Sequence, residues 1–214
     1  MRNRSTILFC TLSALIVLLF AADIAVGSVN IPLRDIWATL TGGECDAVTA
    51  KIIIDIRLTK ALMAILAGAA LAVSGLQMQT LFRNPLAGPY VLGVSSGASL
   101  GVALFILGAP LLGLGSSSLL SSFGVAGAAW VGAAAVLAMV AAVSRRIKDI
   151  MVILILGMMV GSAVSAIVQV LQYMSHEEAL KSFVVWTMGS LGDVSTTQLL
   201  LIVPAVVAGL AIAV

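Results

Sequence analysis

Long apolar runs alternate with short polar segments along this chain, and the pattern predicts membrane-spanning helices. A bilayer core about 30 Å thick requires about 20 apolar residues in a helix. Six runs of suitable length occur, at residues 6–26, 58–82, 91–112, 123–143, 150–173 and 197–214. The segments between them carry nearly all the charge. The sequence therefore predicts an all-α integral membrane protein, a polytopic helical bundle of about six transmembrane helices in which residues 1–214 form a single transmembrane domain.

The composition excludes a water-soluble globular fold, because 61% of the 214 residues are hydrophobic and 9% are charged. With 5% aromatic residues and 20 glycines, the chain favours closely packed helices over a β-barrel with aromatic girdles. The net charge is +2 and the sequence contains no long run of basic residues, so nucleic acid is not an expected partner. Cys10 and Cys45 provide no metal-ligand spacing, and no cofactor is expected.

The distribution of basic residues predicts a cytoplasmic N-terminus. That orientation places six basic residues and one acid, Asp149, in short cytoplasmic segments, as the positive-inside rule requires. The six are Arg2, Arg4, Arg83, Arg145, Arg146 and Lys148. A cleaved signal peptide is the alternative for the first run, but Ala21-Ala22-Asp23 is a poor cleavage region, and we expect a retained span. The chain stops within an apolar run at Val214, from which we expect C-terminal truncation.

Polar side chains in the spans follow helical spacing. In the fifth span, offsets of three, four and three place Ser162, Ser165, Gln169 and Gln172 on one face. The second span adds Ser74, Gln77 and Gln79, and the third begins with Ser95, Ser96 and Ser99. Two interpretations remain open, namely hydrogen bonds between helices and a neutral wall of a translocation pathway. Small residues spaced four apart in spans two to five predict close helix packing.

Several activities are disfavoured by what the spans lack. Apart from Asp23 and Lys60, which lie near the ends of their spans, no acid, base or histidine lies within a span, which argues against a proton relay. No lysine in the chain follows a glycine, so the G-x-x-x-x-G-K phosphate-binding loop is absent from the sequence. This chain is therefore not expected to hydrolyse nucleotides or to be an enzyme. The segment from Gly93 to Gly97 matches G-x-S-x-G, but it opens a membrane helix, and the topology separates Ser95 from His176.

The break between spans two and three contains Arg83, Asn84, Pro85, Gly88 and Pro89. Each proline removes a backbone donor and pushes the preceding residue towards extended geometry. Arg83 is placed to anchor the cytoplasmic interface. We predict a rigid cytoplasmic turn.

Several of these segments together carry a family resemblance. They are Arg57–Lys60, Gly68–Ala72, Ser74–Gly75, Gln79, Arg83–Ala87, Pro89, Leu92–Gly93, Ser95–Ala98 and, later, Trp186–Leu191. The chain resembles the FecCD-type permeases of bacterial ABC importers for iron-siderophore complexes, haem and cobalamin. The resemblance covers essentially the whole chain and is most specific from Arg57 to Gly101. It implies a family total of about ten spans, of which six are present here.

The resemblance also implies partners and residue roles. A second permease subunit, identical or related, a cytoplasmic ATPase dimer and an extracytoplasmic binding protein would complete the importer in the bacterial inner membrane. Arg57 and Lys60 match the arginines that receive the binding protein, with Thr59 in place of a proline; anchoring of the helix end is the alternative role. Spans two and five would line the pathway, and the turn at Lys148 and Asp149 falls at the family's inner gate.

We therefore expect a permease subunit that moves an iron chelate, haem or a corrinoid by alternating access. The alternatives are an ATP-independent secondary transporter or channel-like bundle, and a membrane assembly subunit that transports nothing. The sequence does not identify the cargo.

Overall fold

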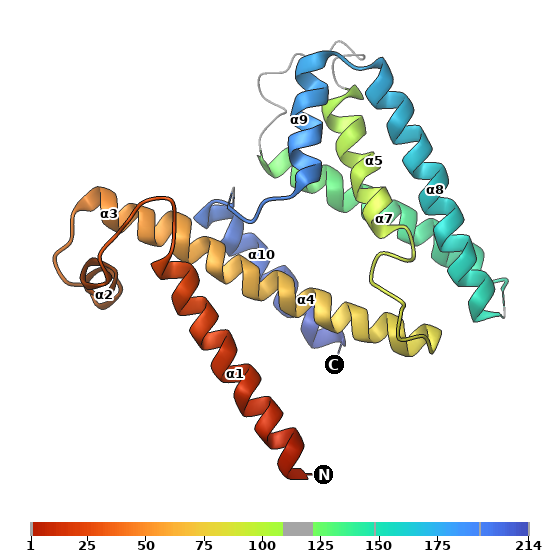
Figure 1. The fold of residues 1–214 in the computed structure, drawn as a ribbon. Coiled ribbons are helices and arrows are strands. Elements are labelled where there is room, and N and C mark those ends of the chain that lie inside the picture. The colour runs from red at the N-terminus through yellow and green to blue at the C-terminus, as the bar shows by residue number, and fades with distance from the viewer. Residues whose placement is uncertain (1, 109–121, 148, 193, 214) are drawn as a thin grey trace. The chain divides into compact units, whose positions relative to one another are not determined.

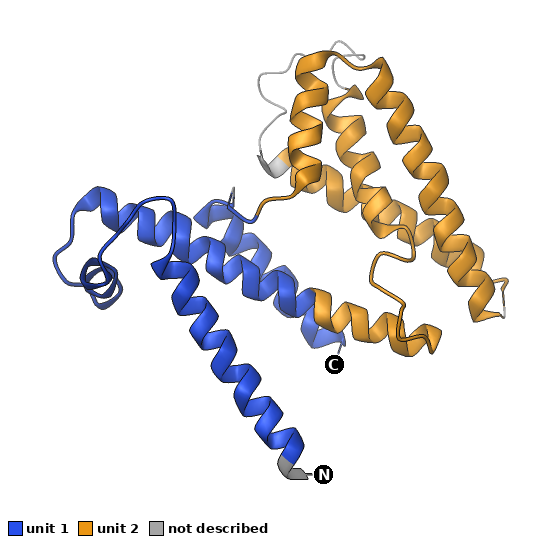
Figure 2. Ribbon diagram, in the orientation of Figure 1, with its two compact units in different colours: residues 1–70, 191–214 blue, residues 71–190 orange. Residues whose placement is uncertain are grey.

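The computed structural model describes residues 2–108, 122–147, 149–192 and 194–213, and every regular element in these residues is helical (Figure 1). The elements are α1 (Arg2–Ala25), α2 (Leu33–Thr41), α3 (Ala47–Lys51), the π-helix η1 (Ile52–Leu58), α4 (Thr59–Phe82), α5 (Val94–Ile106), α7 (Ser122–Ser144), α8 (Ile150–Met174), α9 (Glu177–Met188) and α10 (Thr196–Ala213). The chain forms two compact units, residues 1–70 with 191–214 (unit 1) and residues 71–190 (unit 2), and the division falls within α4 (Figure 2).

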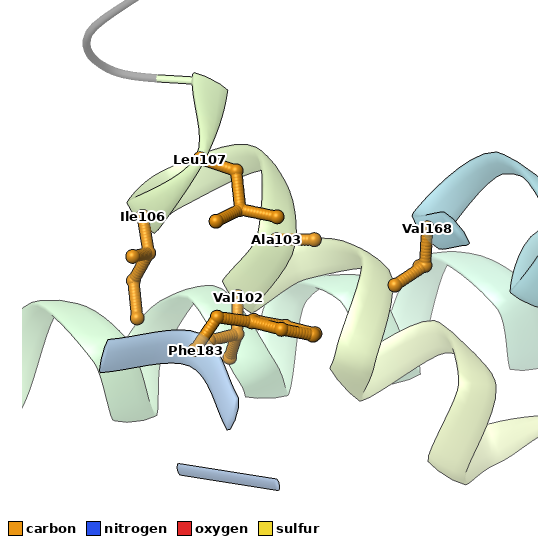
Figure 3. Packing of buried hydrophobic residues seen from close by; sticks show 6 residues of the cluster. All are labelled: Val102, Ala103, Ile106, Leu107, Val168 and Phe183. Carbon is orange, nitrogen blue, oxygen red and sulfur yellow. The ribbon is translucent and has the colours of Figure 1, made fainter. Parts of the chain in front are cut away.

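Unit 2 is organised around α5, which packs against α7, α8 and α9. Its hydrophobic core joins residues of three segments that are distant in sequence: Val102, Ala103, Ile106 and Leu107 from α5 and its C-cap, Val168 from α8, and Phe183 from α9 (Figure 3). Small residues bring α5 and α7 together, because a Cβ built on Gly101 would lie 2.0 Å from the Ala128 carbonyl oxygen. The close packing expected from the small-residue spacing is therefore present between these helices.

Unit 1 contains α1, α2, the continuous helix from α3 through η1 into the first part of α4, and α10. Its buried cluster consists of Ile24, Ile31, Ile36, Ile53 and Ala61. These residues join the C-terminal end of α1 to α2 and to the start of the long helix. The helix ends, rather than the helix middles, are thus where the buried residues of unit 1 gather.

Five helices in the described residues are long and apolar enough to cross a membrane: Arg4–Ala25, Ala47–Phe82, Gly124–Ser144, Ile150–Met174 and Thr196–Ala213. They correspond to five of the six predicted spans, which confirms the fold class. The second is longer than predicted because α3 and η1 extend it backwards from residue 58 to Ala47. At a rise of 1.5 Å per residue its 36 residues reach about 54 Å, so part of it must project from the apolar core or tilt.

The prediction of a full-length third span over 91–112 was wrong in its N-terminal part. The observed helix, α5, begins only at Val94 and has 13 residues, and residues 109–112 lie outside the described residues. Gly93 adopts φ +76°, a left-handed conformation that prevents the helix from starting earlier. The non-helical residues before it pack against α8, which is how irregular backbone is tolerated within a membrane protein.

Three short helical elements are additional to the predicted spans, because the prediction rested on apolar runs long enough to cross a bilayer. They are α2, the α3–η1 extension and α9. Asp46 caps α3 by accepting a hydrogen bond from the Thr49 amide at 3.2 Å, and Glu177 and Glu178 occupy the first turn of α9, where acids favour a helix N-terminus. Both signals were present in the sequence.

Candidate functional site

The polar face of α8 lines an open cavity of about 580 Å³ within unit 2. Its lining comprises Tyr90, Val91, Gly93, Ser96, Gly157, Met158, Gly161, Ser162, Ser165, Ala166 and Gln169. Three of the four predicted α8 residues, Ser162, Ser165 and Gln169, are therefore brought together as expected. None of the lining residues is charged, so the wall offers hydroxyl and amide groups without a fixed ionic site.

The cavity is shaped by a close approach of backbone to backbone. A Cβ built on Gly157 would lie 2.7 Å from the Val91 carbonyl oxygen, and one on Gly161 would lie 3.4 Å from the Gly93 Cα atom. The segment before α5 therefore rests directly on α8. This contact places the Ser165 hydroxyl 3.2 Å from the Ser96 hydroxyl, to which it donates a hydrogen bond. The first interpretation, a hydrogen bond between helices, therefore holds for Ser165, which also lines the cavity, and its part in a translocation pathway stays a prediction.

A second cavity of about 180 Å³ continues along the same face of α8. Gln172, the fourth predicted residue, lines it together with Ser99, Ser165, Val168, Gln169, Phe183 and Thr187. Phe183 and Thr187 belong to α9, which the count of membrane spans did not identify. Thr187 is therefore a polar wall residue that the sequence analysis missed, although the segment around it carried the family resemblance.

The predicted residues of α4 do not join these two walls. Ser74, Gln77 and Gln79 lie in the part of α4 that belongs to unit 2, but neither cavity described above is lined by them. The Ser74 hydroxyl donates to the Leu71 carbonyl of its own helix at 3.2 Å. Their role in a pathway stays a prediction.

The turn after α4 has the geometry that its prolines suggested. The Arg83 amide donates to the Thr80 carbonyl and the Asn84 amide to the Gln79 carbonyl, the two hydrogen bonds of a Schellman C-cap. Arg83 occupies the left-handed position of this cap with φ +47°, where glycine is usual. The Asn84 side chain then accepts from the Leu86 amide at 2.9 Å across Pro85. A helix cap and an Asx turn therefore fix the direction of the chain.

The predicted gate before α8 is described only in part, because Lys148 lies outside the described residues. Asp149 is the N-cap of α8, and its carboxylate accepts a hydrogen bond from the Met151 amide at 2.8 Å. An acid at this position satisfies a free amide and complements the helix dipole. Asp149 thus has a structural task besides any part in gating.

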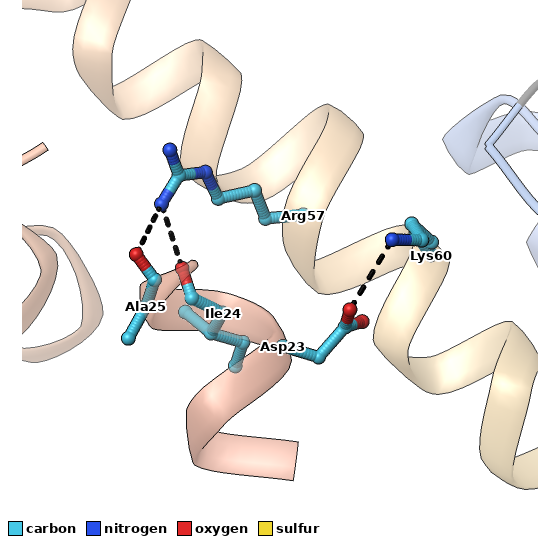
Figure 4. A network of polar contacts seen from close by, with 5 residues as sticks. All are labelled: Asp23, Ile24, Ala25, Arg57 and Lys60. Atoms are coloured by element: carbon cyan, nitrogen blue, oxygen red, sulfur yellow. Dashed lines mark hydrogen bonds and ion pairs between the residues drawn. The ribbon is translucent and has the colours of Figure 1, made fainter. Parts of the chain in front are cut away.

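Arg57 is buried rather than displayed at the surface, with 6% of its area exposed. It donates hydrogen bonds to the Ile24 carbonyl at 2.8 Å and the Ala25 carbonyl at 3.0 Å (Figure 4). A further hydrogen bond runs to the Val29 carbonyl. Ile24 and Ala25 end α1, whose last carbonyls have no partners within the helix. The guanidinium therefore caps α1 and holds the segment that follows it, a contact with another helix that neither predicted role included.

Lys60 has the opposite environment. Its ammonium group lies 3.2 Å from the Asp23 carboxylate, and the two side chains are 48% and 33% exposed (Figure 4). The charge of Asp23, the one acid expected within a span, is thus paired at the end of α1. Lys60 remains accessible to an acidic partner, whereas Arg57 in this conformation is not.

Neither a metal centre nor a strand-turn-helix elbow forms in the described part of the chain. No group of three or more histidine, cysteine or acidic side chains there is placed to hold a metal ion. The segment from Gly93 to Gly97 is the N-terminal turn of α5, and none of the described residues is in a β-strand. Of the two cavities described, neither has a charged residue in its lining.

Comparison with known proteins gives one consistent match. The model of the FecCD transport family matches residues 15–214. The chain is 34% identical over 197 residues to the molybdate import system permease protein MolB of Haemophilus influenzae, covering 88% of this chain and 55% of the relative. It is 36% identical over 201 residues to the hemin transport system permease protein HmuU of Yersinia pestis, covering 92% and 58%.

Further matches agree with these. The vitamin B12 import system permease protein BtuC of Shigella boydii is 34% identical over 187 residues, covering 87% of this chain and 53% of the relative. A solved structure described as an inward-facing conformation of a metal-chelate type ABC transporter superposes with a TM-score of 0.72 at 32% identity, covering 92% of this chain and 57% of that one. The chain spans little more than half the length of each relative.

Proposed function

The chain belongs to the FecCD transport family, and from that premise we propose that it acts as permease in an ATP-driven importer of the bacterial cytoplasmic membrane. The observation that carries the proposal is the uncharged polar cavity along α8, in which Ser162, Ser165 and Gln169 face the same space as Ser96. Such a wall can hydrogen-bond a passing solute without trapping it, because each contact is weak, and its lining lacks the charged groups by which ion-coupled carriers usually act.

The proposed mechanism is alternating access driven from outside this chain. Hydrolysis would take place on a cytoplasmic ATPase dimer, since the sequence has no phosphate-binding loop. A second permease subunit, of the same or a related sequence, would complete the pathway. An extracytoplasmic binding protein would deliver the cargo, and the N-terminus would lie in the cytoplasm. Rigid turns such as that at Arg83–Pro85 suit a subunit whose helices must transmit movement as units.

For the cargo we propose an iron-siderophore complex, haem or cobalamin. The named relatives import hemin, vitamin B12 and molybdate, so membership of the family does not choose among these classes. The uncharged cavity wall favours a cargo whose charge is largely compensated within the complex, as in a chelate or a corrinoid. A bare oxyanion would lose more hydration without gaining an ionic partner there.

We further propose that Lys60 contributes to the docking of the binding protein. Its ammonium group is half exposed, and the ion pair with Asp23 is of the surface type that contributes only about 0–1 kcal/mol to stability. Lys60→Ala should therefore leave membrane abundance unchanged while weakening the affinity for the binding protein. Asp23→Asn is the matched control, because it removes the same ion pair but keeps the lysine charge. Equal affinities for both variants and the native chain would assign no docking role to Lys60.

The experiment that tests the pathway uses two neighbouring residues of α8 that are both exposed. Ser162 lines the cavity and Ala163 does not. Ser162→Phe should block uptake by filling the cavity, whereas Ala163→Phe should be tolerated because its side chain leaves the cavity open. Uptake of radiolabelled iron-siderophore, haem, cobalamin and molybdate is measured in cells that express the native reading frame with its partners, together with membrane abundance. Equal uptake by the two variants at equal abundance would reject the cavity as the pathway.

Co-purification tests the importer class independently. We expect a tagged native reading frame, extracted in mild detergent, to bring an ATPase with nucleotide-binding motifs and an extracytoplasmic binding protein. Uptake that depends on an ion gradient and persists after ATP depletion would instead identify a secondary transporter. Stable partners without flux of any labelled cargo would identify an assembly subunit.

A further inference from the structure

We propose that α2 is an interfacial helix that lies in the headgroup region of the membrane and presents Leu33, Trp37 and Leu40 to lipid. These side chains are 71%, 71% and 47% exposed. Their spacing of four and three residues places them in one stripe along the helix. The inference depends on the chain being a membrane protein and not on its cargo or partners.

The position of α2 relative to α1 fixes its depth. Ile36, one turn before Leu40 at the edge of the apolar stripe, is buried in the cluster that also contains Ile24, Ile31 and Ile53. Ile24 belongs to the last turn of α1, and Ile53 lies near the beginning of the long helix that ends with α4. Figure 1 accordingly shows α2 beside the C-terminal end of α1 rather than along its middle. The helix is therefore held at the level where α1 leaves the apolar core of the bilayer.

Exposed apolar residues also occur in the uncharged segment between α1 and α2. Phe9, Leu12 and Val17 are among the exposed apolar residues of α1, a helix long enough to span a membrane, so lipid is their natural environment. Val26 and Val29, between α1 and α2, are 75% and 49% exposed. No charged residue occurs from Ile24 to Leu33. Lipid that covers α1 therefore meets no charged side chain before it reaches the stripe on α2, and the polar side chains exposed in between are those of Ser28 and Asn30.

The side chains around the stripe suit a membrane interface. Trp37 has an amphipathic ring of the kind enriched at the headgroup level. Exposed Arg34 and Thr41 lie at the polar edge of the stripe next to Trp37, about 100° from Leu33 and Leu40 respectively, where they can reach phosphates and water. The carboxylate-bearing residue Asp35 is half-buried on the far side of the stripe. This arrangement, an apolar stripe with polar residues beside it and an acid on the far side, matches a lipid surface. A protein partner matches it less well, because such a partner would bury the stripe away from the level of the bilayer.

The test compares adjacent residues on different faces of α2. Cys10 and Cys45 are replaced by serine in the full chain, assembled with its partners in nanodiscs. A spin label is then attached at Leu33→Cys or Leu40→Cys, or at the control positions Arg34→Cys and Thr41→Cys. Labels at 33 and 40 should collide severalfold more often with oxygen, which concentrates in lipid, than with a water-soluble nickel chelate. Labels at 34 and 41 should show the reverse preference.

Two results would overturn the proposal. Equal access of the nickel chelate to all four labels would mean that the stripe faces water. Protection of labels 33 and 40 from both reagents would mean that protein covers it. A second measurement avoids altering the stripe: with Trp130→Phe and Trp186→Phe, Trp37 is the tryptophan left in residues 1–214, and its signal is the difference from a variant that also carries Trp37→Phe. Lipids brominated near the headgroup should quench this signal more than lipids brominated at the chain ends. Absence of quenching by either lipid would equally reject the interfacial position.

Discussion

Arg57 is the buried charge on which unit 1 depends, and its removal gives a sharp prediction. Arg57→Ala deletes three hydrogen bonds from a charged donor to carbonyls at and beyond the end of α1. Hydrogen bonds to charged groups contribute about 1.5–3 kcal/mol each, but the three share one guanidinium and do not add. The segment after α1 is otherwise held chiefly by Ile31 in the buried cluster. We expect the free energy of local opening to fall by about 2–4 kcal/mol, close to the cost of leaving one partner of a buried charge unsatisfied.

Amide hydrogen exchange of Ile24, Ala25 and Val26, whose amides belong to the last turn of α1, measures this change directly. Since each 1.4 kcal/mol is a factor of ten, exchange there should accelerate by about 30-fold to 1,000-fold, while the core of unit 2 should be unaffected. Arg57→Lys should give an intermediate effect, because a single ammonium group keeps the charge but loses the planar fork that reaches several carbonyls. Lys51→Ala is the matched control, as Lys51 is an exposed basic residue one to two turns earlier in the same continuous helix.

Unchanged exchange in Arg57→Ala would refute the reasoning, since it would mean that the carbonyl contacts hold nothing in place. An acceleration as large in Lys51→Ala would show that net charge, rather than the guanidinium geometry, is responsible. The result also affects how docking experiments are interpreted. If the segment between α1 and α2 opens in an Arg57 variant, a loss of uptake in that variant does not show that Arg57 contacts a binding protein.

Two further predictions concern backbone geometry. A Cβ on Gly132 would lie 2.2 Å from the Gly97 carbonyl oxygen, so Gly132→Ala should force α5 and α7 apart and cost about 1–3 kcal/mol, seen as a lower thermal unfolding midpoint in detergent. Gly127→Ala, in the same helix with no atom within 4 Å of the new Cβ, should be neutral or slightly stabilising, and an equal loss in both would contradict the packing account. Arg83 has φ +47°, so Arg83→Gly should keep or slightly raise the unfolding midpoint. Arg83→Val should lower the midpoint, because a β-branched residue in this conformation costs about 1–2 kcal/mol of unfolding free energy. A higher midpoint for the valine variant than for the glycine variant would exclude the observed cap.

Much of the fold follows from the sequence because hydrophobic length is a local property. An apolar run must cross the bilayer or be covered by protein, so the positions of α1, α4, α7, α8 and α10 can be read directly from the chain. The polar face of α8 is equally local, since offsets of three and four residues fix which side chains share a face. The sequence therefore determined that Ser162, Ser165 and Gln169 would lie together.

What those side chains meet was decided by tertiary structure. The shortened α5 depends on Gly93 and on the backbone of residues 91–93 resting against Gly157 and Gly161, a contact between segments more than sixty residues apart. The same contact brings Ser96 to Ser165 in the wall of that cavity, whose lining contains no residue of α4. No local pattern specifies such a pairing.

Arg57 makes the distinction plainest. Its place at the start of an apolar run, and its match to a family motif, predicted a charge offered to a partner or an anchor of the helix end. The fold places the last carbonyls of α1 within reach, and a buried guanidinium must satisfy its donors wherever acceptors are available. The sequence by itself determined that a charge would stand where the apolar run begins. Only the tertiary structure decided that it faces inward, because the acceptors that hold it belong to another helix.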